Sequence, residues 1–115
     1  MHEMSLAQEI VASIREHVGT ERLPRVTKVT MEIGAASGVV AESLQFAFDA
    51  IVQETSLSSV RMITTIVPFV VHCSHCGSDS QNDGGYMLCS RCDSPDVTVV
   101  SGAELILKQI ELKDS

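Results

Sequence analysis

Four cysteines fall in two close pairs, a residue type and spacing typical of metal sites. Cys73 and Cys76 form the first Cys-x-x-Cys pair, Cys89 and Cys92 form the second, and twelve residues separate the pairs. Each pair brings two thiolates round one tight turn, and two such turns supply the tetrahedral set of sulfur ligands that Zn²⁺ accepts. The pattern therefore predicts one zinc ion held by all four thiolates.

Other interpretations of the cysteines stay open at this point: two disulfides, a redox-active dithiol, reduced buried cysteines, or iron in the same ligand set. Zinc is favoured because the first residues lack the basic start of a secretory signal, and cysteines of a cytoplasmic protein are kept reduced. Four thiolates complete the coordination of zinc, so we expect a structural ion with no open position for water or substrate.

Three further polar residues flank the cysteine pairs. His72 and His75 lie beside the first pair, and Asp93 follows the second. These side chains are expected either to tune the zinc through hydrogen bonds, to replace a thiolate, or to extend toward another metal. The alternative is that both histidines are solvated loop residues.

His2 supplies a second, different kind of metal ligand. The α-amine of Met1, the backbone nitrogen of His2 and its imidazole Nδ1 lie in one continuous chelating arc. With the intervening amide deprotonated, these three nitrogens occupy three corners of a square, an arrangement that suits Ni²⁺ or Cu²⁺ better than Zn²⁺. Glu3, a histidine of the cysteine segment or a partner's group is expected at the fourth corner. The alternative is a frayed terminal residue without a ligand role.

Two helices are expected in the chain that positions these sites. Apolar residues recur at a spacing of three and four between Met4 and Val18, which predicts an amphipathic helix that ends at Gly19. The same spacing returns from Val40 to about Glu54 and predicts a second helix.

Strands are expected between and after these helices. Residues 28–33 alternate polar and apolar side chains and predict a half-buried strand. The β-rich stretches 60–71, 97–100 and 103–112 predict further strands, and Pro68 predicts an edge or a bulge because it has no amide proton to donate.

Composition excludes several partners and classes. Eight Lys and Arg against 15 Asp and Glu give a net charge of -7, which repels the phosphates of nucleic acid. No apolar run approaches the roughly 20 residues that a membrane span needs. We therefore expect a cytoplasmic protein. We find no phosphate-binding glycine loop, no nucleophile motif and no open zinc site in the sequence, so we predict that the protein is not an enzyme.

The sequence resembles a known family in its terminal motif, its elements and its cysteines together. Met1-His2-Glu3-Met4-Ser5, the helix-strand-helix order and Cys73-x2-Cys76-x12-Cys89-x2-Cys92 are similar to the HypA/HybF family of hydrogenase nickel-incorporation proteins. The resemblance covers essentially the whole chain. It implies that Met1, His2 and Glu3 present nickel while the four cysteines hold structural zinc.

The same resemblance implies partners. Nickel would move to the large subunit of a [NiFe] hydrogenase, and HypB, a GTPase, would be the accessory partner. In some members the same protein also serves urease maturation. The alternative function is a zinc-ribbon adaptor that binds protein or nucleic acid without nickel transfer.

We therefore predict an α+β fold in which two helices pack on a small mixed β-sheet, with an inserted zinc-ribbon-like knuckle segment. Residues 1–71 together with 95–115 are expected to form a nickel-binding α+β domain. Residues 72–94 are expected to form the zinc-binding domain.

Overall fold

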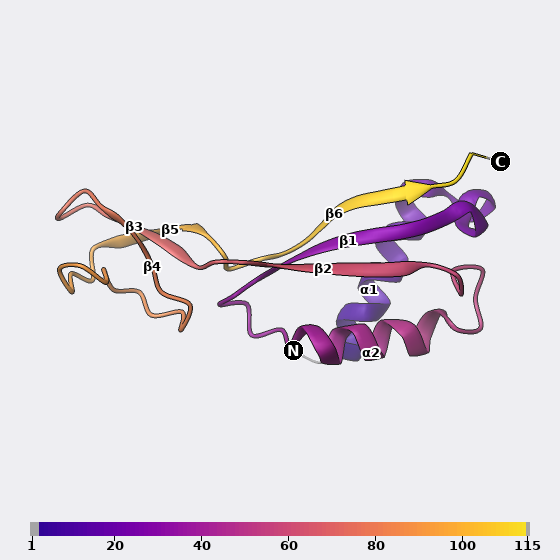
Figure 1. Cartoon of the computed structure of the whole chain (residues 1–115), viewed down its shortest axis with the longest axis horizontal. Coiled ribbons are helices and arrows are strands. Elements are labelled where there is room, and N and C mark those ends of the chain that lie inside the picture. The colour runs from indigo at the N-terminus through magenta and orange to yellow at the C-terminus, as the bar shows by residue number, and fades with distance from the viewer. Residues whose placement is uncertain (1–2, 115) are drawn as a thin grey trace. The chain divides into compact units, whose positions relative to one another are not determined.

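The computed structural model describes residues 3–114, and Figure 1 shows their helices and strands. In chain order these elements are α1 (Glu3–Val18), a 3-10 helix η1 (Thr20–Arg25), β1 (Val26–Gly34), α2 (Ala41–Val52), β2 (Arg61–Val67), β3 (Val70–Cys73), β4 (Asp79–Gln81), β5 (Val97–Ser101) and β6 (Leu105–Leu112). The strands form two three-stranded sheets, with the orders β2-β1-β6 and β4-β3-β5. The predicted α+β class, with two helices and small sheets, is confirmed.

The described residues divide into two compact units. The first unit combines residues 3–31, 40–64 and 107–114, and the second combines 32–39 with 65–106. All four cysteines lie in the second unit. The predicted domains, residues 72–94 for zinc binding and the remaining residues for nickel binding, have other boundaries than these two units. The predicted division into a nickel-binding and a zinc-binding domain stays a prediction.

The apolar stripe of α1 is buried, as its spacing predicts. The buried residues are Leu6, Ala7, Ile10, Val11, Ile14 and Val18. Met4 lies at the start of the helix and is exposed, although the spacing assigned it to the stripe. Gly19 follows with a φ of 81°, and its amide donates to the Arg15 carbonyl at 2.9 Å, so the helix ends at the predicted residue.

The second helix and the first strand complete the main core. Helix α2 contacts α1 and buries Leu44, Ala47 and Phe48. Strand β1 alternates as predicted: Val29, Met31 and Ile33 are buried, and the intervening Thr30 and Glu32 are partly exposed. In Figure 1 α1 passes behind the sheet that contains β1, and α2 lies against α1. Among residues 3–114, no helix is long and apolar enough to cross a membrane.

The prediction of a single strand over residues 60–71 is wrong. The structure divides this stretch into β2 and β3, which belong to different sheets. Pro68 separates them, since a proline has no amide proton for a ladder. The Phe69 amide instead donates to the Asp83 side chain at 3.1 Å, and the Phe69 carbonyl accepts from the Asn82 amide at 2.8 Å. The sequence also gave no indication of β4, the short partner of β3.

Two glycines let three segments of the second unit approach closely. A Cβ at Gly34 would lie 2.3 Å from the Gly102 carbonyl oxygen, and a Cβ at Gly102 would lie 2.3 Å from the Pro68 carbonyl oxygen. Backbone bonds use this proximity: the Gly34 amide donates to the Glu104 carbonyl at 2.8 Å. The Ser101 hydroxyl donates to the Pro68 carbonyl at 2.9 Å. Any side chain at either glycine would force these segments apart.

Replacing Gly102 by Ala should therefore destabilise the protein by about 3 kcal/mol, about 1 from its left-handed backbone and about 2 from overpacking. Gly38→Ala is the matched control, because Gly38 has a φ of 81° but no atom within 4 Å of the added Cβ. This control should lose only about 1 kcal/mol. Urea unfolding followed by circular dichroism measures both losses, and equal losses would show that the close approach has no energetic weight.

Candidate metal centre

The four cysteine side chains gather in one cluster. Their sulfur atoms all lie within 4.8 Å of one another, and all four are free of disulfide bonds. Cys73 and Cys89, the first cysteine of each pair, are fully buried, whereas Cys76 is exposed. The structure thus brings together all four residues that the spacing selected.

The sulfur separations fit a zinc ion. Tetrahedral coordination with Zn–S bonds of about 2.3 Å places the sulfur atoms about 3.8 Å apart. The Sγ atoms of Cys73 and Cys92 are 3.6 Å apart, and those of Cys76 and Cys89 are 3.7 Å apart. Each of these contacts joins one pair to the other, as two opposite edges of a tetrahedron do. The donor set therefore suits zinc and supplies four thiolates around one position.

Both pairs are shaped by the same backbone turn. In the first turn, the Cys73 amide donates to the Ser78 carbonyl and the Gly77 amide donates to the Cys73 carbonyl, each at 2.9 Å. In the second, the Cys89 amide donates to the Ser94 carbonyl and the Asp93 amide donates to the Cys89 carbonyl, each at 2.9 Å.

The conformation of the fifth residue in each turn also repeats. Gly77 has a φ of 76°, and Asp93 occupies the equivalent position with a φ of 62°. Asp93, a candidate for tuning the metal, thus serves the turn through its backbone.

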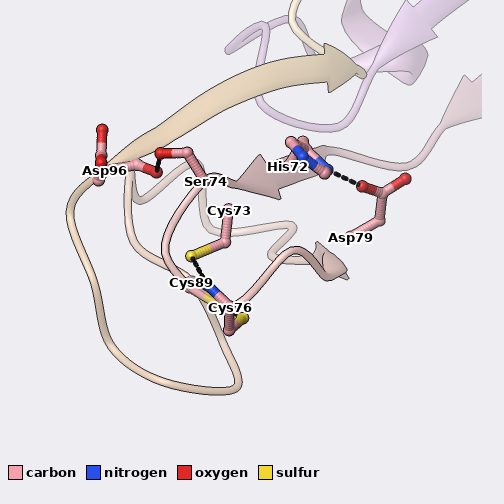
Figure 2. Close-up of polar contacts among 7 residues, drawn as sticks. All are labelled: His72, Cys73, Ser74, Cys76, Asp79, Cys89 and Asp96. Atoms are coloured by element: carbon pink, nitrogen blue, oxygen red, sulfur yellow. Dashed lines mark hydrogen bonds and ion pairs between the residues drawn. The ribbon is translucent and has the colours of Figure 1, made fainter.

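Backbone amides donate to sulfur inside each turn. The Cys76 amide donates to Cys73 Sγ at 3.4 Å, drawn as a dashed line in Figure 2, and the Arg91 amide donates to Cys89 Sγ at 3.4 Å. Hydrogen bonds of this kind stabilise a thiolate over a thiol. They prepare the sulfur atoms for a cation before it binds.

The four thiols differ in their readiness to lose a proton. The Ser78 hydroxyl, followed by the Ser78 amide, lowers the pKa of Cys76 from 9.0 to about 6. The amide of Arg91, followed by that of Cys92, lowers the pKa of Cys89. The Ser94 amide favours the Cys92 thiolate, but desolvation and the neighbouring sulfurs outweigh it and raise the pKa of Cys92 to about 12. A divalent cation is needed to remove the last protons.

Side chains that the sequence interpretation missed tie the two turns to the sheet. The amide and hydroxyl of Ser74 both donate to the Asp96 carbonyl at 3.0 Å, and Figure 2 shows the hydroxyl contact. The amide of Ser90 donates to the Ser80 hydroxyl at 3.1 Å, and the Ser90 hydroxyl donates to the Gln81 carbonyl at 3.1 Å. A signal for these roles exists: the two turns have the near-identical sequences CSHCGS and CSRCDS.

The histidines near the cluster do not join it. Among residues 3–114, the group of side chains placed to hold a metal contains the four cysteines and no histidine. His72 pairs with Asp79 across β3 and β4, with 2.6 Å between the histidine Nδ1 and the carboxylate (Figure 2). His75 lies in the first turn and is exposed. The predicted roles of these histidines in tuning or replacing a ligand stay predictions.

The predicted nickel ligands lie mostly outside the described structure. Met1 and His2 precede residue 3, where the description begins. Glu3 is the first residue of α1 and is partly exposed.

The fold and the cysteine cluster together define a class of protein: a small α+β protein with a four-cysteine metal site. The family model described as "Hydrogenase/urease nickel incorporation, metallochaperone, hypA" matches residues 1–112. The chain therefore belongs to the HypA family of hydrogenase and urease nickel-incorporation metallochaperones. The family resemblance of the sequence is thereby confirmed.

Individual relatives agree with this assignment. The chain is 36% identical over 113 residues to the hydrogenase maturation factor HypA of Geobacter metallireducens, covering 98% of this chain and 100% of the relative. It is 32% identical to that of Aquifex aeolicus, covering 98% of each chain. A solution structure of the Ni metallochaperone HypA from Helicobacter pylori matches with a TM-score of 0.69 over 97% of both chains. At 23% identity, that structural likeness shows the fold alone.

Gly77→Ala should weaken the first turn by about 1 kcal/mol, because an L-residue there must adopt the left-handed backbone region. Gly77→Asn should lose less, since asparagine enters this region more readily. No atom lies within 4 Å of a Cβ at Gly77, so the difference reports backbone conformation and not crowding. Competition for zinc with a chelator measures both variants, and a larger loss for Asn than for Ala would contradict the backbone explanation.

Zinc binding at pH 7 should release fewer than four protons. The pKa of Cys76 is about 6, so this thiol is already a thiolate at pH 7, whereas Cys92, with a pKa of about 12, must still lose its proton. Because Cys76 also becomes protonated below pH 6, zinc affinity should fall more steeply there than between pH 7 and 8. Calorimetry in buffers of different ionisation enthalpy counts the released protons.

Ser78→Ala should increase the number of protons released at pH 7, because it removes the hydroxyl that lowers the pKa of Cys76. Ser94→Ala is the matched control from the second turn, where the serine hydroxyl accepts from the Asp96 amide at 3.1 Å. Release of four protons by the parent protein at pH 7 would contradict the assignment of Cys76 as a thiolate at that pH.

Proposed function

We propose that this protein binds Ni²⁺ through Met1, His2 and Glu3 and delivers it for maturation of a [NiFe] hydrogenase. The observation that carries the proposal is the match of residues 1–112 to a family described by hydrogenase and urease nickel incorporation. The relatives from Geobacter metallireducens and Aquifex aeolicus, both named hydrogenase maturation factor HypA, support a hydrogenase as the client.

The chemistry of the first residues supports nickel as the cargo. The α-amine of Met1, the backbone nitrogen of His2 and the His2 imidazole form fused chelate rings, and three nitrogens in one plane suit Ni²⁺. Glu3 offers a carboxylate next to them, at the start of α1. A fourth ligand that can be exchanged, from Glu3 or from a partner, gives a route for release.

Zinc in the cysteine cluster has a different role in this proposal. Cys73, Cys76, Cys89 and Cys92 would hold the ion in a closed sulfur shell, which leaves no position for water or substrate. The ion would therefore act as a structural cofactor. Nickel, by contrast, is the transported metal.

The proposed partners follow from the family resemblance. A HypB-type GTPase is the expected accessory protein, the large subunit of the hydrogenase is the recipient, and urease maturation proteins are further candidates. The cytoplasm is the proposed location. No catalytic step is assigned to this protein.

His2→Ala should abolish tight nickel binding and leave the zinc content unchanged, because the two sites use different residues. His17→Ala is the matched control: His17 is an exposed histidine of α1 whose Nδ1 lies 2.7 Å from the Ser13 carbonyl oxygen. Isothermal titration with Ni²⁺ and metal analysis measure the outcome. The protein must carry a free amine at Met1, verified by mass spectrometry, because added residues would convert that amine into an amide.

Binding should also weaken as the pH falls from 8 toward 6, since protons compete for the amine and the imidazole. A zinc-ribbon adaptor would show none of this dependence on His2. Unchanged nickel affinity in a His2→Ala protein with a blocked amine would refute the terminal site and leave family membership intact.

A further inference from the structure

A groove of about 430 Å³ opens in the second unit beside strand β5. Its apolar lining includes Val67, Val99, Val100 and Ile106. Exposure is high: Val99, Val100 and Ile106 leave 44%, 55% and 44% of their surface accessible. Apolar side chains that gather in one exposed groove mark an interaction surface more often than scattered ones do.

Strand β5 offers main-chain groups beside this groove. It is the last strand of the sheet β4-β3-β5, so one of its edges has no strand partner within residues 3–114. Residues 97–103 contain no charged side chain, although charge is a common protection of an exposed edge. An edge of this type can accept an added strand, whose main chain supplies affinity and whose alternate side chains supply specificity.

Strand β5 has a β-bulge where it lines the groove. Val71 of β3 pairs with Val99, and Val70 pairs with Ser101, so Val100 is an extra residue in β5. Consecutive side chains of a regular strand point to opposite faces. The bulge lets the consecutive residues Val99 and Val100 both line the groove.

The charge of the groove selects the occupant. Glu32 and Glu104 are the charged residues among the described ones that line it, and Glu32 already interacts with another residue of the protein. The Glu104 carboxylate beside an apolar surface is complementary to lysine or arginine next to an apolar residue. A second copy of this chain is a poorer match, because it carries a net charge of -7.

We propose that the β5 edge and its groove bind an extended segment of a partner protein in which apolar residues alternate with lysine or arginine. The segment adds a strand to β5, buries an apolar side chain against Val100 and Ile106, and places a cation at Glu104. The surface lies wholly within residues 32–106 and uses neither proposed metal site, so this proposal does not rest on nickel transfer.

The test uses a fluorescein-labelled peptide of about seven residues, alternating Val and Lys, long enough for one strand. Fluorescence anisotropy measures its binding to the zinc-loaded full chain, and amide hydrogen exchange locates it. We expect slower exchange within residues 97–106 and weaker binding at high salt. Val100→Ser should weaken binding about tenfold, because a buried valine contact is lost. Glu104→Lys should weaken it about fivefold and reduce its salt dependence.

Phe46→Ser is the matched control, because Phe46 is an exposed apolar residue on α2 of the first unit, with 76% of its surface accessible. This variant should bind the peptide with unchanged affinity. A peptide with Glu in place of Lys, or one with alternate backbone nitrogens methylated, should bind at least tenfold more weakly. The proposal would be overturned if either of these control peptides bound as tightly as the Val-Lys peptide. It would also be overturned if the Val-Lys peptide slowed amide hydrogen exchange only outside residues 97–106. Sedimentation that reveals a dimer, lost in Val100→Ser, would assign the groove to a second copy instead.

Discussion

Repulsion among four sulfur atoms, held within 4.8 Å of one another, is the constraint on which the second unit depends. Four negative thiolates cannot coexist there without a cation, and the pKa of Cys92, raised to about 12 by desolvation and the neighbouring sulfurs, expresses that repulsion. The second unit buries few large apolar side chains: its buried hydrophobic residues are Ile33, Phe69, Val71, Cys73 and Cys89. A small core of this kind needs another source of stability. A metal ion held by the four cysteines would supply it, because the ion would bind the folded arrangement of ligands.

The two cysteine turns position their sulfur atoms in the same way and have nearly the same sequence. Each turn buries its first cysteine, donates an amide to that cysteine's sulfur and continues through a left-handed residue. A serine after the first cysteine of each turn, Ser74 and Ser90, binds a neighbouring segment. The metal site is therefore held by backbone geometry as much as by the choice of cysteine. Zinc has only to complete an arrangement that the chain already favours.

The sequence predicted those features whose physical cause is local. The ends of α1, the alternation of β1 and the cysteine cluster follow from periodicity, a glycine with positive φ and fixed ligand spacing. The division of residues 60–71 into strands of two sheets does not, because it depends on long-range bonds from Phe69 to Asn82 and Asp83. Strand β4 was missed for the same reason: its three residues acquire β structure only by pairing with β3. The supporting serines were detectable, but only by comparing the two turns with each other.

Strand β5 raises the question of how an uncharged, valine-rich edge avoids indiscriminate pairing. Natural edges are protected by charge, by proline, by short length or by bulges. β5 uses the last two: it spans only Val97–Ser101, and the bulge at Val100 interrupts a regular ladder. These devices disfavour an extended intermolecular sheet, yet they leave the groove apolar and accessible. An edge protected by shape instead of charge remains able to accept one short strand, and the carboxylate of Glu104 beside it then determines which strands are accepted.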